Sequence, residues 1–229
     1  MKKSASSAIL IGVFLLVMVP AACDNGKSRT LTVGVLNVTR NLDESLAGFK
    51  AGMTELGYTE GKNIRYLYDG PTKEINKLSA AARNLLAAKA DMILTITTPA
   101  TLAVKEATAG SGLPVVFAIV TDPVGAGIVQ SMRQPGGNIT GVTFGPQEAR
   151  RLEWLVRIAP DIRRIYAPFN PKDKSPVLAL KMVRNAAAKL GVELITREAH
   201  DPETLEDAVL NIPAEADAVF LLPDSYIST

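Results

Sequence analysis

The chain has 229 residues, 47% hydrophobic and 21% charged, so it has enough apolar material for a packed core and is not disordered in bulk. Its formal net charge of +2, from 25 basic and 23 acidic residues, argues against a nucleic-acid-binding surface. One cysteine excludes an intramolecular disulfide, and one histidine cannot form a metal site with spaced partners. The length allows one large or two small α/β domains.

The amino terminus has the pattern of an export signal. Lys2 and Lys3 precede an apolar run at residues 9–19, which is well short of a bilayer span, and the small pair Ala21-Ala22 follows. We therefore expect a signal peptide over residues 1–22.

The junction after Ala22 resembles a lipoprotein signal, in which Cys23 becomes the lipidated first residue of the mature protein. Pro20 departs from that pattern, because an aliphatic residue is usual at its position. The alternative is ordinary cleavage after Ala22, which leaves Cys23 as an unmodified terminal cysteine. Both alternatives predict an exported protein, and the polar residues 23–30 are suited to a flexible tether.

Strands and helices are predicted to alternate over residues 31–143. The apolar pattern predicts strands at residues 31–38, 64–68, 92–96, 115–120 and 139–142. Helices are predicted at residues 42–56, at residues 72–88 and from Pro99 to near Gly110. Thr98 is predicted to cap the last of these helices. After Thr121-Asp122-Pro123, the small residues Gly125-Ala126-Gly127 are predicted to begin a helix, and residues 128–132 form a short amphipathic piece. Strand–helix–strand units at this spacing indicate a parallel sheet.

A second series follows. Gly145-Pro146 opens a helix that ends at Pro160, with Leu152, Leu155, Val156 and Ile158 facing inward and Trp154 in buried packing. Strands are predicted at 164–167, 192–196 and 218–222, a turn at 168–171, and helices at 176–190 and 202–210. The fold class is therefore α/β with two lobes, at residues 31–143 and 144–229, each a parallel sheet with helices on both faces.

Three segments carry a family resemblance: ELGYTEGKNI at 55–64, VTDPVGAG at 120–127 and PGGNITGVT at 135–143. They resemble the ABC-transporter substrate-binding proteins that include tryptophan- and tyrosine-binding lipoproteins. The resemblance implies a type I periplasmic-binding-protein fold, an amino-acid ligand with aromatic ones among the candidates, and an ABC permease in the membrane as partner. Members continue beyond the end of this chain, so we expect the second lobe to be incomplete.

Polar residues recur where the predicted strands end, which is where open parallel sheets bind ligands. Thr97, Thr98 and Thr121 would hold a ligand carboxylate through hydroxyls and backbone N–H groups, and Asp122 or Asp224 would hold an ammonium group. Phe144 could stack on an aromatic ligand. The complete set of candidate ligand-binding residues is Asn37, Thr39, Thr97, Thr98, Thr121, Asp122, Thr143, Phe144, Asn170, Asp224 and Ser225.

Several of these residues also have structural interpretations. Thr97 and Thr98 could simply cap a helix, Asp122 could cap the turn that follows it, Phe144 could pack at a hinge, and Asn170-Pro171 is a common turn sequence. The lone His200 precedes Asp201-Pro202 in a polar loop and is predicted to lie at the surface.

The sequence shows no nucleophile elbow, kinase or dehydrogenase signature, so we expect no catalytic residue, metal or cofactor. The favoured hypothesis is an exported solute-binding component of an ABC importer, which binds its ligand between two lobes. The alternatives are a ligand-sensing domain for a signalling partner and an exported α/β enzyme. The fold alone does not distinguish these three functions.

Overall fold

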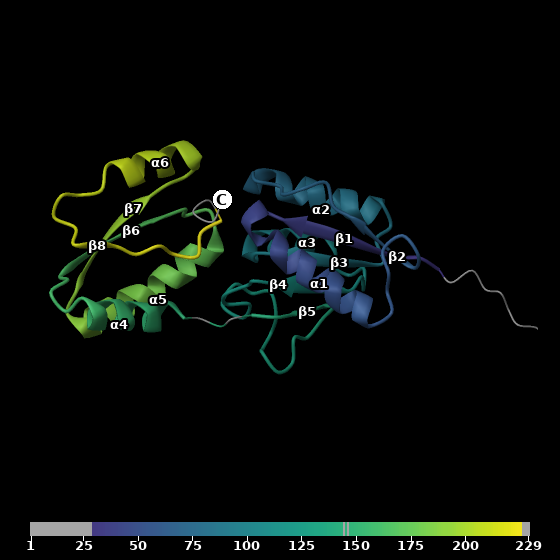
Figure 1. Cartoon of the computed structure of the whole chain (residues 1–229), viewed down its shortest axis with the longest axis horizontal. Coiled ribbons are helices and arrows are strands. Elements are labelled where there is room, and N and C mark those ends of the chain that lie inside the picture. Colours follow the sequence, from purple (N-terminus) through teal and green to yellow (C-terminus); the bar gives the residue numbers. More distant parts are fainter. Residues whose placement is uncertain (1–28, 144, 146, 226–229) are drawn as a thin grey trace, which may run out of the picture.

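The computed structural model describes residues 29–143, 145 and 147–225, which form two separate parallel sheets covered by helices (Figure 1). The predicted signal peptide, Cys23 and Phe144 lie outside the described residues. Within the described residues, no helix has both the length and the apolar character needed to cross a bilayer. We call the part from β1 to β5 lobe 1 and the part from α4 to β8 lobe 2.

Lobe 1 is built on a five-stranded sheet. Its strands are β1 (Leu31–Asn37), β2 (Ile64–Leu67), β3 (Met92–Ile96), β4 (Val115–Ala118) and β5 (Ile139–Gly141), all parallel in the order β2-β1-β3-β4-β5. The chain leaves β1 for β2 on one side and then returns to β3 on the other. This reversal between β1 and β3 is the point at which doubly wound sheets bind ligands.

Helices cover both faces of this sheet. The helix α1 (Asp43–Glu55), preceded by a 3₁₀ turn at Arg40–Leu42, buries Leu46 against Val33 and Val35. The helices α2 (Leu78–Ala87) and α3 (Thr98–Ala107) pack on the other face around Leu36 and Phe117, and a 3₁₀ turn at Ile75–Lys77 leads into α2. The strands alternate their buried side chains between these two clusters, as period-two geometry requires.

Lobe 2 repeats the arrangement on a smaller scale. The strands β6 (Arg164–Phe169), β7 (Glu193–Glu198) and β8 (Ala218–Val219) are parallel in the order β7-β6-β8. The helices α4 (Glu148–Ile158) and α5 (Lys174–Leu190) pack together on one face of this sheet, and α6 (Pro202–Leu210) packs on the opposite face.

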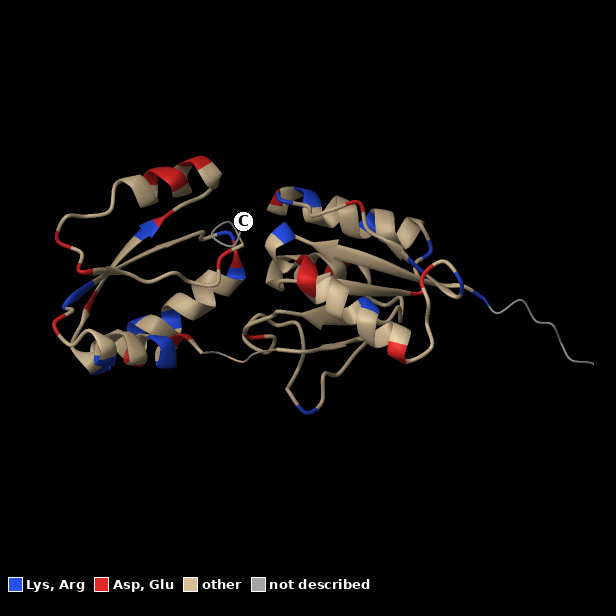
Figure 2. Ribbon diagram, in the orientation of Figure 1, with Lys and Arg blue, Asp and Glu red and all other residues tan. Residues whose placement is uncertain are grey.

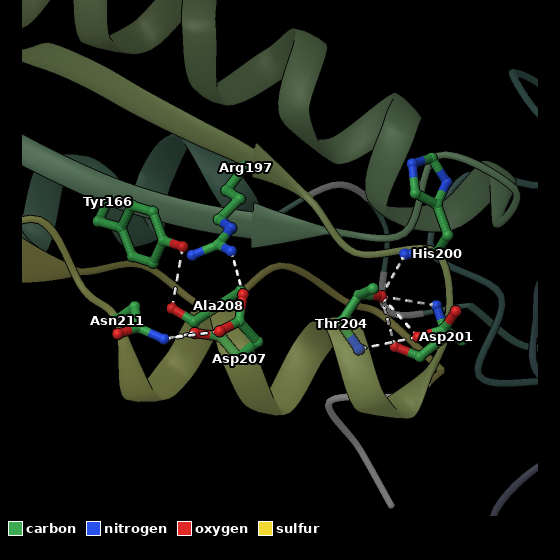
Figure 3. Close-up of polar contacts among 8 residues, drawn as sticks. All are labelled: Tyr166, Arg197, His200, Asp201, Thr204, Asp207, Ala208 and Asn211. Atoms are coloured by element: carbon green, nitrogen blue, oxygen red, sulfur yellow. Dashed lines mark hydrogen bonds and ion pairs between the residues drawn. The ribbon is translucent and has the colours of Figure 1, made fainter.

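Polar contacts fix α6 to its sheet (Figure 3). The buried Tyr166 hydroxyl of β6 donates to the carbonyl oxygen of Ala208 at 3.0 Å. At the start of the helix, Asp201 and Thr204 form a capping box, with the Thr204 N–H donating to Asp201 Oδ1 at 2.8 Å. Arg197 of β7 pairs with Asp207. His200 is exposed, as predicted, and its backbone N–H donates to the Thr204 hydroxyl.

Most element types match the sequence-based expectation, but several bounds were wrong. The strand at 92–96 and the helix at 202–210 have the predicted bounds. The helix expected from residue 72 begins only at Leu78, because the Thr72 N–H donates to the Asn37 carbonyl oxygen and holds that segment against the end of β1. The cap of α3 is Thr97 and not Thr98, β8 is only two residues long, and β6 runs through Pro168, where a turn was expected.

Three further expectations were wrong. The small residues at 125–127 do not begin a helix, because residues 123–127 form turns and bends follow at residues 128–130 and 132. In α4, which begins at Glu148, Trp154 is 50% exposed and Ile158 is 79% exposed, although both were expected to face inward. The inward stripe of α4 is set by Leu152. Because each helical residue turns the chain by about 100°, Trp154 and Ile158 point well away from that stripe.

Candidate functional site: a cavity between the lobes

A cavity of about 60 Å³ lies between the lobes at the carboxyl ends of the strands. It has room for a few water molecules, which is less than the volume of a typical ligand pocket. Both lobes line it, and most of its polar lining is hydroxyl. The lining residues are Thr39, Leu42, Thr97, Thr98, Ile119 and Thr121 from lobe 1, and Ser175, Pro223, Asp224 and Ser225 from lobe 2.

Thr97 has the most unusual local geometry in this cavity. It caps α3 with φ 90° and ψ 157°, a backbone conformation that a β-branched residue rarely adopts. The residue is 7% exposed, and its Oγ1 has no hydrogen-bond partner among the described residues. Ile119, which lines the same cavity from the end of β4, also has a positive φ of 55°. Strained backbone of this kind clusters at functional sites.

The amino end of α3 is open to a negatively charged group. Its first turn contains no acidic residue, and Thr97 makes no side-chain capping hydrogen bond. Thr98, the first residue of the helix, is 2% exposed and lines the cavity. Unsatisfied N–H groups and the helix dipole at such an end favour an anion.

The amino end of α5 on the other side of the cavity already has a carboxylate. Asp173 caps this helix, and its Oδ1 accepts a hydrogen bond from the Ser175 N–H at 2.8 Å. Burial raises the pKa of Asp173 to about 6, because desolvation outweighs the hydrogen bonds from Ser225 and Ser175, and the nearby Asp224 adds to the increase. Asp173 does not line the cavity itself, but it gives lobe 2 an acidic side directly behind the lining residues Ser175 and Ser225.

Asp224 completes this acidic side. It is 2% exposed and lines the cavity. Its Oδ2 accepts a hydrogen bond from the Asn170 N–H at 2.6 Å, which links the end of β6 to the segment after β8. The cavity therefore has hydroxyls and an open helix end on the side of lobe 1, and the Asp224 carboxylate with two serines on the side of lobe 2.

Direct contacts connect the lobes beside the cavity. The hydroxyl oxygens of Thr121 and Ser175 are 3.5 Å apart, and Lys174 Nζ donates to the Ala126 carbonyl oxygen at 3.3 Å. Leu178 of α5 packs against the hydrophobic cluster of lobe 1. These contacts hold the lobes close together and account for the small volume of the cavity.

The structure brings six of the predicted site residues to this cavity: Thr39, Thr97, Thr98, Thr121, Asp224 and Ser225. Asn37 and Asn170 are buried behind it, where Asn37 Nδ2 donates to Asp43 Oδ1 at 2.8 Å. Asp122 does not line it and caps its own turn, with Oδ1 accepting from the Gly125 N–H at 2.8 Å. Thr143 does not line it either, and its Oγ1 accepts from the Gly145 N–H at 2.9 Å.

Sequence reasoning missed Ser175, which lines the cavity, and the buried Asp173, which accepts hydrogen bonds from the lining residues Ser175 and Ser225. The signal was present, because Asp173 precedes a segment with Pro176 near its start, and aspartate is a favoured helix cap. What the sequence does not indicate is that the same carboxylate reaches Ser225, which lies 52 residues further along the chain. Among the described residues, no group of three or more His, Cys, Asp or Glu side chains is placed to hold a metal ion.

Comparison with known proteins gives a consistent set of relatives. Residues 32–229 match the family model described as ABC transporter substrate binding protein. A tyrosine-binding protein of Clostridioides difficile (strain R20291) is 24% identical over 204 residues, which cover 89% of this chain and 59% of that protein. The chain thus spans about three fifths of the length of this curated relative.

Two solved structures are also similar. A conserved domain protein from Vibrio cholerae O1 biovar El Tor is 28% identical with a TM-score of 0.81, over 88% of this chain and 68% of that one. An ABC domain in complex with L-Trp from Streptococcus pneumoniae is 26% identical with a TM-score of 0.78, over 87% of this chain and 67% of that one.

Proposed function

Because the chain belongs to the ABC transporter substrate binding protein family and has the type I periplasmic-binding-protein fold, we propose that it is the extracytoplasmic solute-binding component of an ABC importer. One observation indicates where the solute would bind. The unpartnered, buried hydroxyl of Thr97 lies beside the open amino end of α3, in a cavity that both lobes line. We propose no catalytic step for the chain.

The ligand we propose is an amino acid. Its carboxylate would bind at the amino end of α3, to the hydroxyls and N–H groups of Thr97, Thr98 and Thr121. Its ammonium group would face the carboxylate of Asp224, since a desolvated cation needs a charged partner. The L-Trp complex of the pneumococcal neighbour and the name of the tyrosine-binding relative support an amino acid, with aromatic ones among the candidates.

Binding requires the lobes to move apart. A cavity of about 60 Å³ is too small for an amino acid, so the contact between Thr121 and Ser175 must break for the ligand to enter. The ligand would then stabilise a closed form by touching both lobes, and that form would dock on a membrane permease. The hinge we propose is the connection between β5 and α4, with the lobes divided at residues 143 and 144.

Export and anchoring belong to the same proposal. The apolar run at residues 9–19 and the small residues before Cys23 support a cleaved signal and a lipid attached to Cys23. A lipid at this position, followed by the polar residues up to 30, would tether lobe 1 to the outer face of the membrane.

Calorimetric titration of the chain with the twenty amino acids tests the ligand, and two isosteric variants test the site. Thr97→Val removes a hydroxyl that has no hydrogen-bond partner in the described part of the chain, so the folded protein should retain its melting temperature. We expect the affinity for the ligand to fall about 10- to 150-fold, since a lost hydrogen bond to a charged group costs about 1.5–3 kcal/mol.

Thr140→Val is the matched control, because Thr140 is exposed on β5 and does not line the cavity. Equal affinities in the two variants would place the ligand elsewhere. Absence of binding to any amino acid would overturn the proposed ligand class.

A further inference from the structure

Lobe 2 is electrically polarised across its sheet (Figure 2). The helix α5 contains four Lys or Arg residues and no carboxylate, and its neighbour α4 contains three arginines and two glutamates. On the opposite face, α6 contains three carboxylates and no cation. Figure 2 shows the basic residues gathered on α4 and α5 at one edge of the lobe and the acidic residues of α6 at the other.

The basic side also exposes large apolar side chains. Trp154 is 50% exposed and Ile158 is 79% exposed, and the two residues are four apart on α4, so they lie on one face of the helix. Arg150 and Arg157 are exposed on the same face, at four residues before and three residues after Trp154. The Arg157 guanidinium carbon lies 5.2 Å from the centre of the Trp154 ring.

Arg151 has a different role. Its Nη2 donates to the Leu221 carbonyl oxygen at 3.0 Å, and its guanidinium stacks 4.8 Å from the centre of the Phe220 ring, so it fixes α4 to the segment after β8. The cations and large apolar side chains that face solvent here are Arg150, Trp154, Arg157 and Ile158 of α4 with Lys181 and Arg184 of α5, all exposed. We call these six residues the basic-aromatic surface. The exposed carboxylate of Glu153 lies between Arg150 and Arg157 on the same helix face, so the cations of the surface outnumber it by four to one.

We propose that the basic-aromatic surface binds an anionic lipid bilayer. Exposed tryptophan and arginine on one helix face, with an aliphatic side chain beside them, suit the region between headgroups and acyl chains. The cations are spread over two adjoining helices and do not converge on one point, so they match a laterally continuous negative surface. The acidic α6 on the opposite face would be repelled by that surface, so lobe 2 would bind it in one orientation.

This surface is separate from the proposed ligand cavity, because none of its six residues lines that cavity. Loss of membrane binding would therefore leave the proposed ligand binding intact, and failure of either proposal is distinguishable from failure of the other.

Trp154 is the only tryptophan in the sequence, so its fluorescence reports directly on this surface. The experiment uses the full chain with Cys23→Ala, which removes any acylation, mixed with vesicles of phosphatidylcholine alone or with phosphatidylglycerol at about a third of the lipid. We expect a blue shift of the Trp154 emission with the anionic vesicles only. Co-sedimentation should be stronger with these vesicles than with neutral ones, to which the apolar N-terminal segment can also bind. We also expect the partition coefficient to fall steeply as salt is added, because the attraction is screened.

A pair of charge-matched variants separates this surface from a general effect of net charge. Arg150→Glu/Arg157→Glu should lower the partition coefficient at least 25-fold, since each basic residue near an anionic surface contributes about fivefold. Arg83→Glu/Arg133→Glu makes the same charge change at two exposed positions of lobe 1 and should leave partitioning within about twofold. The N-terminal segment is the same in both variants, so its own membrane affinity cancels.

Circular dichroism and the melting temperature verify that each variant is folded, and Arg150→Gln/Arg157→Gln replaces the glutamate variant if that one is not. An unshifted Trp154 spectrum with anionic vesicles overturns the proposal. So does equal loss of binding in the lobe 1 variant. Binding of the surface to an acidic protein without binding to vesicles would also overturn it.

Discussion

The carboxylate of Asp173 accepts two hydrogen bonds from Ser225, one from the hydroxyl at 2.6 Å and one from the backbone N–H at 3.2 Å. Asp173 also caps α5, so one buried side chain fixes the start of that helix and the segment after β8. Ser225 lines the cavity between the lobes, and the ionisation of Asp173 therefore bears on the stability of lobe 2 beside the proposed ligand site.

Asp173→Asn should flatten part of the pH dependence of stability. The folded-state pKa of about 6 lies above the ordinary value of 3.8, so the folded chain holds this proton more tightly than the unfolded chain. The resulting stabilisation is fully present below about pH 4 and is lost as the pH rises through 6, by roughly 3 kcal/mol. Urea denaturation of both proteins from pH 4 to 7 measures it. A difference between the two curves that does not change with pH contradicts this prediction.

Thr97→Gly should stabilise the folded chain and weaken ligand binding. Glycine relieves the strain of a backbone held at φ 90°, whereas the greater conformational entropy of glycine in the unfolded chain opposes this effect. On balance we expect the free energy of unfolding to rise by about 1 kcal/mol. Lys89→Gly is the control, because Lys89 also has a positive φ, of 54°, but is exposed and does not line the cavity. Chemical denaturation should show a gain in both variants, and only Thr97→Gly should lose affinity in the titration. If Thr97→Gly and Lys89→Gly bind the ligand with equal affinity, the strained backbone at Thr97 has no role in ligand binding.

Gly141→Ala should destabilise lobe 1 by roughly 2–3 kcal/mol. A Cβ at this position of β5 would lie 2.2 Å from the Phe117 carbonyl oxygen and 2.5 Å from its ring, so the two strands would have to shift apart. Gly48→Ala in α1 is the opposite case, because nothing lies within 4 Å of its Cβ and alanine favours a helix by about 1 kcal/mol. Thermal unfolding should move in opposite directions for the two variants. A neutral Gly141→Ala would show that β4 and β5 are further apart.

Tyr166→Phe should cost about 1 kcal/mol of stability. The tyrosine is 1% exposed, and its hydroxyl satisfies the Ala208 carbonyl oxygen in α6, which would be left without this donor. Tyr58→Phe serves as the control, since Tyr58 is 39% exposed and its hydroxyl can reach water. Hydrogen exchange of α6 amides should increase in Tyr166→Phe alone. Unchanged exchange would mean that α6 is held by its apolar contacts.

The sequence predicts the alternation of strands and helices because buried parallel strands need continuous apolar runs, such as residues 92–96. It also predicts that Thr97 and Asp224 lie at one cavity, since each follows a strand end and the strand ends of the two lobes are expected to converge there. It does not predict the positive φ of Thr97 or the partners of Asp173, because both depend on contacts between segments far apart in the chain. The outward positions of Trp154 and Ile158 follow from the rotation of α4 relative to Leu152, which packing against α5 sets.

The separate hydrophobic clusters of the two lobes affect how the unfolding of this molecule can be observed. The buried clusters of lobe 1 and the buried cluster of lobe 2 share no residue, and Leu178 is a lobe 2 side chain packed against a lobe 1 cluster. Because the only tryptophan is in lobe 2, its emission follows the loss of that lobe alone, whereas far-ultraviolet circular dichroism follows both. Coincident transitions in the two signals would show one cooperative unit, and separate transitions would give each lobe its own free energy of unfolding.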